Sequence, residues 1–167
     1  MTDDGQILYA RSGDDWVLRV EGPLRYTNAS SVDRFIDRLF NDARPTSVSV
    51  DLNGATTIDS TGIGLLAKIA RGLARADGAR PVVFSANPEI NELLTSVCLD
   101  DVCCIVPSGA GMAPGEVAAI PVVPVEERVL ARTIADAHRL LCELSEDNRV
   151  QFQQVVEAFD REAGRVP

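Results

Sequence analysis

The segment 59–64, DSTGIG in one-letter code, holds the residues of this chain best suited to carry a regulated chemical group. It follows a buried strand and a turn and opens a stretch with helical periodicity, so Ser60 is expected at the start of a helix. A serine hydroxyl there can cap free backbone amides, and a phosphate attached to it would meet those amides and the positive end of the helix dipole. The two glycines remove side-chain cover, so another protein could approach the backbone. We therefore predict either a simple helix cap or a regulated binding site at Ser60.

The same residues do not form a catalytic pattern. A serine hydrolase needs Gly-x-Ser-x-Gly on a tight turn, with a histidine and an acid as partners. Residues 58–62 lack the first glycine. The only histidine, His138, belongs to a polar stretch far along the chain, where we expect a surface or half-buried residue. The segment that begins at Asp59, DSTG, does not match the Asp-Thr-Gly or Asp-Ser-Gly motif of aspartic proteases. We predict no catalytic residues and no enzymatic activity.

The cysteines and the lone histidine argue against a metal or cofactor. Cys98, Cys103, Cys104 and Cys142 show no Cys-x-x-Cys spacing. A single histidine and cysteines at these intervals do not match the ligand spacing of a zinc site. We expect reduced, mostly buried thiols, no metal and no cofactor.

Charge and hydropathy restrict the partners and the location. The 167 residues carry a net charge of −9, which disfavours nucleic-acid binding because that binding depends on clustered Lys and Arg. The N-terminus is polar and acidic, and no apolar run approaches the ~20 residues that span a bilayer. We expect a soluble cytoplasmic protein that does not insert into membranes.

Strand and helix patterns alternate through the first two thirds of the chain. The expected elements are a β-hairpin (7–11 and 16–21), a helix (28–40), a strand (47–52), a helix (60–76), a strand (81–84), a helix (88–97) and a last strand (102–106). Such alternation predicts an α/β fold, in which a mixed β-sheet with parallel pairs is flanked by helices.

The last third of the chain has a different character. We expect one domain over 1–107, a Ser-, Gly-, Ala- and Pro-rich linker over 108–124, and a helical hairpin over 125–167. Two apolar stripes in the hairpin must be covered, because isolated helices of this length are marginal in water. We expect the hairpin to pack on an apolar surface of the first domain, away from Ser60, or to form a homodimer contact.

Residues 7–107 resemble the STAS family, which includes anti-sigma factor antagonists and the cytoplasmic tails of sulfate transporters. The resemblance is carried by the hairpin, the Gly-Pro-Leu turn at 22–24 and the strand that leads into 59–64. It implies a STAS-like fold in which Ser60 is phosphorylated by a serine kinase that is also the anti-sigma factor. The unphosphorylated protein would bind this kinase and release a sigma factor, and a phosphatase would reverse the phosphorylation.

The resemblance also implies a set of site residues. Many antagonists have an acidic residue in the loop before the first helix, where this chain has Arg25 followed by Tyr26. Beside Ser60, the expected partner-binding residues are Asp59, Thr61, Gly62, Ile63, Gly64, Leu66, Arg25 and Tyr26. The alternative is a non-phosphorylated scaffold, or an accessory subunit of a signalling or membrane-transport complex. The Ser60-Thr61 pair favours the switch, while Arg25 and the extra hairpin leave room for the alternative.

Overall fold

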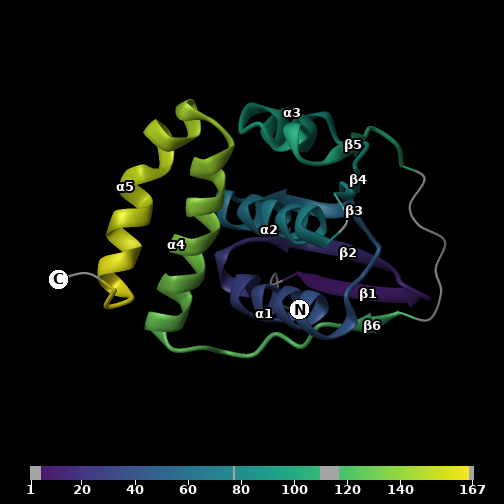
Figure 1. Cartoon of the computed structure of the whole chain (residues 1–167), viewed down its shortest axis with the longest axis horizontal. Coiled ribbons are helices and arrows are strands. Elements are labelled where there is room, and N and C mark those ends of the chain that lie inside the picture. Colours follow the sequence, from purple (N-terminus) through teal and green to yellow (C-terminus); the bar gives the residue numbers. More distant parts are fainter. Residues whose placement is uncertain (1–4, 77, 110–116, 166–167) are drawn as a thin grey trace.

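A six-stranded mixed sheet forms one layer of the molecule (Figure 1). The structure is a computed structural model that describes residues 5–76, 78–109 and 117–165. Its strands are β1 (Gln6–Ser12), β2 (Asp15–Leu24), β3 (Ser47–Ile58), β4 (Val82–Phe84), β5 (Cys104–Val106) and β6 (Ala118–Ala119). The order across the sheet is β5-β4-β3-β2-β1-β6. Strands β2 to β5 pair in parallel, and β1 is antiparallel to both β2 and β6, which confirms the predicted mixed sheet.

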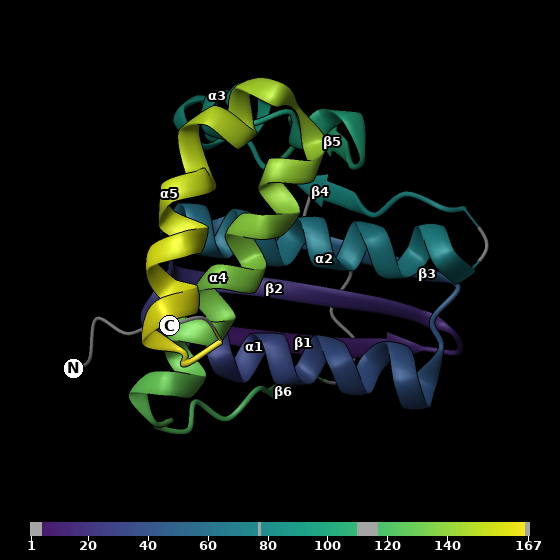
Figure 2. The ribbon, with the colours of Figure 1, turned by 60° about the vertical axis from the view of Figure 1, so that its left-hand side comes forward.

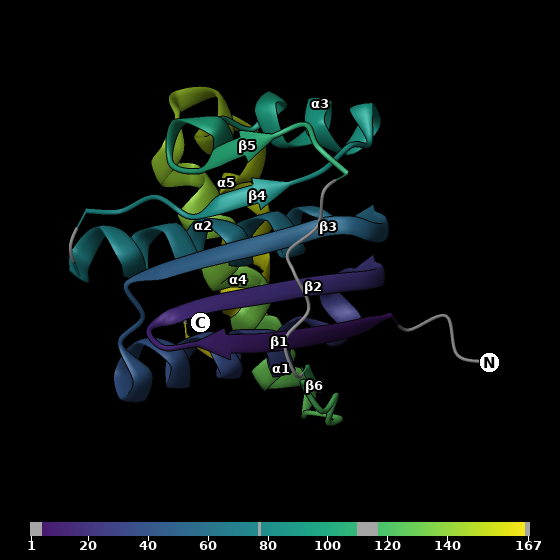
Figure 3. The same cartoon turned by 90° about the vertical axis from the view of Figure 1, so that its right-hand side faces the viewer.

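Two layers of helices lie on the same side of the sheet. The helices are α1 (Tyr26–Arg38), α2 (Ser60–Ala76), α3 (Pro88–Ser96), α4 (Glu127–Leu144) and α5 (Glu146–Glu162), with short helical turns η1 (Leu39–Ala43) and η2 (Leu99–Asp101). Figure 3 shows α1 and α2 directly behind the sheet, and α4 and α5 behind them. The sheet, the α1–α2 pair and the α4–α5 pair are therefore three successive layers.

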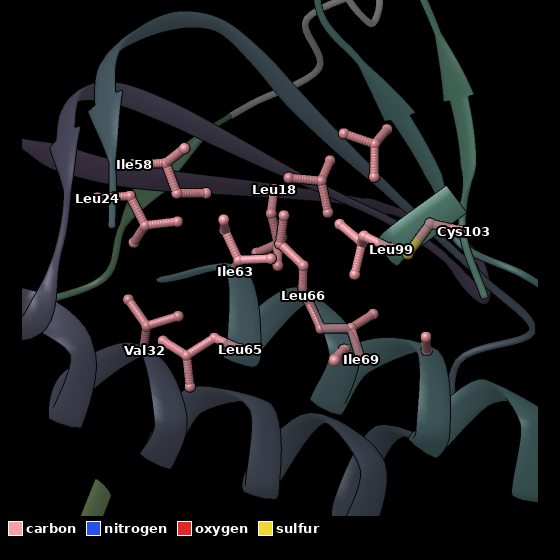
Figure 4. Close-up of a cluster of buried hydrophobic side chains, with 14 of the residues drawn as sticks. Leu18, Leu24, Val32, Ile58, Ile63, Leu65, Leu66, Ile69, Leu99 and Cys103 are labelled. Atoms are coloured by element: carbon pink, nitrogen blue, oxygen red, sulfur yellow. The ribbon is translucent and has the colours of Figure 1, made fainter. Parts of the chain in front are cut away.

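The core lies between the sheet and α2. Leu18 of β2 and Ile58 at the end of β3 face Ile63 and Leu66 of α2, and Leu65 lies beside Val32 of α1 (Figure 4). Residues 61–67 of α2 are all buried, so the helix is covered on most of its circumference and not on one face alone. This burial fixes the start of α2 firmly against the ends of β2 and β3.

Strand β3 is longer than the sequence pattern predicts. We expected a strand over 47–52, but β3 continues to Ile58 because its second half pairs with the end of β2. Gly54 fits there because a Cβ on it would lie 2.9 Å from the Val20 carbonyl oxygen. The Asn-Gly pair at 53–54, which locally favours a turn, is thus overridden by pairing between strands far apart in the sequence.

The predicted linker contains a sixth strand. β6 pairs with β1, and the amide of the buried Ile120 donates to the Ile7 carbonyl at 2.8 Å. The Val123 amide donates to the Ser31 hydroxyl at 3.0 Å, so the chain is held beside α1 as it approaches α4. The pairing is non-local and only two residues long, which explains why composition alone indicated an unstructured linker.

The α4–α5 hairpin packs on the rest of the chain. Both helices run across α1 and α2, and α4 contacts both of them (Figure 2). Ser145 ends α4 and caps α5 by accepting the Asn148 amide at 3.0 Å. The Asn148 side chain is buried and donates to the Leu141 carbonyl and to the Val97 carbonyl after α3. The predicted helical hairpin is confirmed. The apolar stripe of α4 is largely buried within this chain, whereas in α5 Phe152 and Val156 are buried and Val150 is 72% exposed.

Candidate functional site

Asp59 connects the first turns of α1 and α2. Its Oδ1 accepts the Gly62 amide of α2 at 2.8 Å, and its Oδ2 accepts the Tyr26 amide of α1 at 2.9 Å. Its own amide donates to the Leu24 carbonyl at the end of β2. The carboxylate satisfies backbone donors that would otherwise lack partners at two helix ends. A simple helix cap was one of the two roles considered for Ser60, but Asp59 caps α2 and the Ser60 hydroxyl has another partner.

That partner is His138, on α4. Ser60 Oγ lies 2.7 Å from His138 Nε2, and His138 Nδ1 lies 2.7 Å from the Ile134 carbonyl oxygen. A carbonyl oxygen can only accept, so Nδ1 carries the ring proton and Nε2 accepts from the Ser60 hydroxyl. The hydroxyl of Ser60 is therefore oriented toward α4.

Burial keeps His138 uncharged. The residue is only 4% exposed, and its ring and the Phe152 ring of α5 form a T-shaped contact with their centroids 5.5 Å apart. Burial lowers the pKa of His138 below its ordinary value, although the hydrogen bond to Ile134 and the charge of Asp59 act in the opposite direction. A neutral imidazole can accept the Ser60 proton, but its other nitrogen is oriented by a backbone carbonyl and not by a carboxylate.

The sequence-based placement of His138 was wrong. We expected a surface or half-buried residue, whereas His138 is buried and lies against Ser60. A signal for this was present: Ile134, His138 and Leu141 are spaced four and three residues apart, so they share one helical face. A histidine in an apolar stripe indicated a buried residue with a hydrogen-bonding partner, and the partner came from 78 positions earlier in the chain.

The expected position of the hairpin was also wrong. We placed it away from Ser60, but α4 lies directly on the first turns of α2. A Cβ on Gly64 would lie 2.4 Å from the Ala137 carbonyl oxygen, so the absent side chain allows the two backbones to touch. We call the surface of α2 formed by Ser60, Thr61 and Gly64 the Ser60 face. In this structure α4 covers it.

The other predicted partner-binding residues fall into two groups. Thr61, Gly62, Ile63, Gly64 and Leu66 are buried, whereas Asp59 and Arg25 are half-buried and Tyr26 is 48% exposed. Tyr26 lies with Ser60 and His138, but the Arg25 side chain lines a different depression, beside Pro23 and Thr57. The structure thus brings Tyr26, and not Arg25, to the surroundings of Ser60.

A groove of about 540 Å³ lies beside Ser60 and His138. Its walls come from the starts of α1 and α2 and from the facing sides of α4 and α5. They are mostly apolar, with two acidic residues, Glu127 of α4 and Glu162 of α5. The lining residues are Tyr26, Ser60, Thr61, Glu127, Leu130, Ala131, Ile134, His138, Val155, Phe159 and Glu162.

Within the described ranges, no group of three or more His, Cys, Asp or Glu side chains could hold a metal ion. The four cysteines are free thiols, but only Cys103 is buried, with burial raising its pKa to about 12. Cys98 and Cys142 are half-buried and Cys104 is exposed, so the expectation of mostly buried thiols was wrong. Across the part of the chain that the structure describes, every helix is too short or too polar to cross a membrane.

Several solved structures share this fold. An anti-sigma factor antagonist from Mycobacterium paratuberculosis is 20% identical with a TM-score of 0.57, over 65% of this chain and 91% of that one. The unphosphorylated anti-sigma factor antagonist SpoIIAA is 16% identical with a TM-score of 0.52, over 62% of this chain and 88% of that one. The phosphorylated form of the Bacillus cell fate determinant SpoIIAA is 18% identical with a TM-score of 0.50, over 60% and 90%.

The family model of the STAS domain matches residues 6–109. No curated protein sequence matches the chain. The matched span begins with β1, contains Asp59 and Ser60, and ends just after β5, so α4 and α5 lie beyond it. Because this span covers well over half of the sequence and the fold agrees, the chain belongs to the STAS domain family.

Proposed function

We propose that this chain is a cytoplasmic binding protein without enzymatic activity, an anti-sigma factor antagonist controlled by phosphorylation of Ser60. The observation that supports it best is the position of Ser60, in the first turn of α2 and directly after a carboxylate that fixes two helix ends. A protein of the same fold, SpoIIAA, has been solved in unphosphorylated and phosphorylated forms.

The proposed partner is an anti-sigma factor that is also a serine kinase, with a phosphatase acting on the phosphorylated form. The unphosphorylated protein would bind the kinase through Asp59, Tyr26 and the Ser60 face, after α4 has moved off that face. A phosphoserine adds about −1.5 to −2 charge and three acceptor oxygens next to Asp59. Like charge and the cost of desolvating the phosphate would both oppose docking of the partner.

The test begins with protein purified from its native host. Intact-mass analysis should reveal a species heavier by one phosphate, and this species should be absent from Ser60→Ala. The Ser12→Ala variant is a matched control, because Ser12 is an exposed serine at the end of β1. It pairs with Asp15 at the start of β2, whereas Leu24 and the site lie at the other end of that strand. If the phosphate is absent under all growth conditions, or persists in Ser60→Ala, the proposal fails.

A second candidate is a non-phosphorylated STAS scaffold or accessory subunit. It is favoured by one observation: the Ser60 hydroxyl already has a hydrogen-bond acceptor in α4, and α4 covers the Ser60 face. A scaffold predicts that Ser60→Ala keeps full function in the host. The switch predicts that Ser60→Ala and Ser60→Glu have opposite effects on sigma-dependent transcription.

A further inference from the structure

We propose that the α4–α5 hairpin is an intramolecular ligand of the unphosphorylated Ser60 face, and that phosphorylation of Ser60 expels it. This inference rests on the proposed function, because it concerns the same serine. It assigns to residues 127–162, which lie beyond the family match, the position that an external partner would otherwise take.

The first argument is the space between α2 and α4. The helices already touch at Gly64 and Ala137, so α4 cannot move closer. One residue further along α4, His138 Nε2 lies at hydrogen-bond distance from Ser60 Oγ, which leaves no room for a phosphoryl group between these atoms. Esterification also removes the hydroxyl proton, and Nε2 of the neutral ring is an acceptor that then has no donor.

The second argument is charge. A phosphate that turned away from His138 would enter the adjacent groove, whose charged residues from α4 and α5 are Glu127 and Glu162. Asp59, the residue directly before Ser60, adds a third carboxylate. His138 could provide at most one positive charge, and only by ionising while buried. About two negative charges would thus face three carboxylates, and this repulsion is relieved when α4 and α5 move away.

The third argument is that the ion pairs of the hairpin lie within the hairpin. Arg139 of α4 pairs with Asp160 of α5, and Arg165 pairs with both Asp136 and Asp160. Among the described residues, no ion pair joins the hairpin to the rest of the chain. The hydrogen bonds between the hairpin and the layers below include those of Ser30 with Thr133, of Ser60 with His138, and of the Asn148 side chain with the Val97 carbonyl. Water can replace all three when the hairpin moves away.

The connection to the sheet permits such a movement. Residues 120–126 join β6 to α4, and Val122 and Val123 within them are about half exposed. β6 itself is paired with β1 and does not need to move. The hairpin can therefore separate from α2 as one body while the sheet, α1 and α2 stay folded.

The experiment uses the full chain with phosphoserine incorporated at Ser60 during translation. Amide hydrogen exchange should become roughly tenfold or more faster in α4 and α5 than in the unmodified chain, with α2 and the sheet unchanged. His138 is the only histidine, so its ring signals report the contact without ambiguity. Its pKa, which burial lowers, should rise toward the ordinary value of a solvated histidine.

Two controls keep the inference falsifiable. Phosphoserine at Ser12, which is exposed and pairs with the end of β2 opposite Leu24, should leave the exchange of α4 unchanged. Gly64→Ala should open the hairpin without any phosphate, which would show that the domain survives opening. Unchanged protection of α4 after phosphorylation of Ser60, or tighter protection with a protonated His138, would overturn the inference. The result is independent of whether the host phosphorylates Ser60, which tests the proposed function separately.

Discussion

Gly64 of α2 and Ala137 of α4 meet without any side chain between them, and a Cβ on Gly64 would lie 2.4 Å from the Ala137 carbonyl oxygen. Because that atom belongs to the backbone of a buried helix, it cannot move aside locally. The contact determines how closely α4 approaches Ser60. It also means that a single methyl group added at Gly64 disturbs the packing of the hairpin on α2.

Gly64→Ala should therefore destabilise the closed structure by about 1–3 kcal/mol, the usual cost of overpacking a filled site. Gly72→Ala is the matched control in the same helix. A Cβ at Gly72 would meet the ring of Phe40, which is a side chain that can turn away. Thermal unfolding of both variants checks the prediction. An equal loss of stability in the two variants would mean that α2 tolerates no alanine at its glycines, and that the contact with α4 is not the cause.

Stability should depend on pH through His138. The pKa of the folded residue is lowered by burial, so near and below pH 6.5 the unfolded chain binds more protons than the folded one. The free energy of unfolding should therefore fall as the pH decreases from about 7.5 to 5.5. Urea denaturation across this range measures the slope. In His138→Gln, which keeps a hydrogen-bonding side chain but does not titrate, the slope should be smaller; an unchanged slope would assign the effect to other groups.

The Asp59 carboxylate should contribute more than an ordinary cap because it accepts amides from two helices. Asp59→Ala removes both bonds and should cost up to ~2 kcal/mol, while Asp59→Asn keeps one carbonyl acceptor and should cost less. Urea titrations give the values. Exchange of the Tyr26 and Gly62 amides should rise in Asp59→Ala; if only Gly62 responds, the link to α1 is not stabilising.

A pair of substitutions at Ser60 separates charge from size. Ser60→Glu and Ser60→Gln are nearly equal in volume, but only Glu places a negative charge beside Asp59 and toward Glu127. The Glu variant should expose α4 to limited proteolysis several-fold more than the Gln variant, because like charges repel at this short range. Identical digestion of the two would point to steric displacement alone.

The sequence predicted the fold well because its signals are local. Alternation in β1 and β2, the apolar stripe of α2 and the Ser145 cap each arise within a few neighbouring residues. The second half of β3 and the strand β6 were missed because their stability comes from pairing with distant strands, which outweighs an Asn-Gly pair or a Pro-rich composition.

The candidate site was predicted in part for the same reason. Asp59 and Ser60 are neighbours in a recognisable motif, so their position at the start of α2 followed from the sequence. The contact of Ser60 with His138 depends on where α4 packs, and both helices have apolar stripes that several surfaces could have covered. Gly64, which has no side chain, allows α4 to pack closely on this surface. A glycine there would equally allow an external protein to dock, so the residue type alone does not predict which of the two binds.

The short connection between β6 and α4 has a kinetic consequence. Because residues 120–126 hold the hairpin close to α2, its effective concentration at the Ser60 face is on the order of millimolar. An external protein at cellular concentration would compete with a ligand that rebinds immediately after each release. Association with such a protein should then reach a plateau as its concentration increases, at a rate equal to the opening of α4 and independent of diffusion.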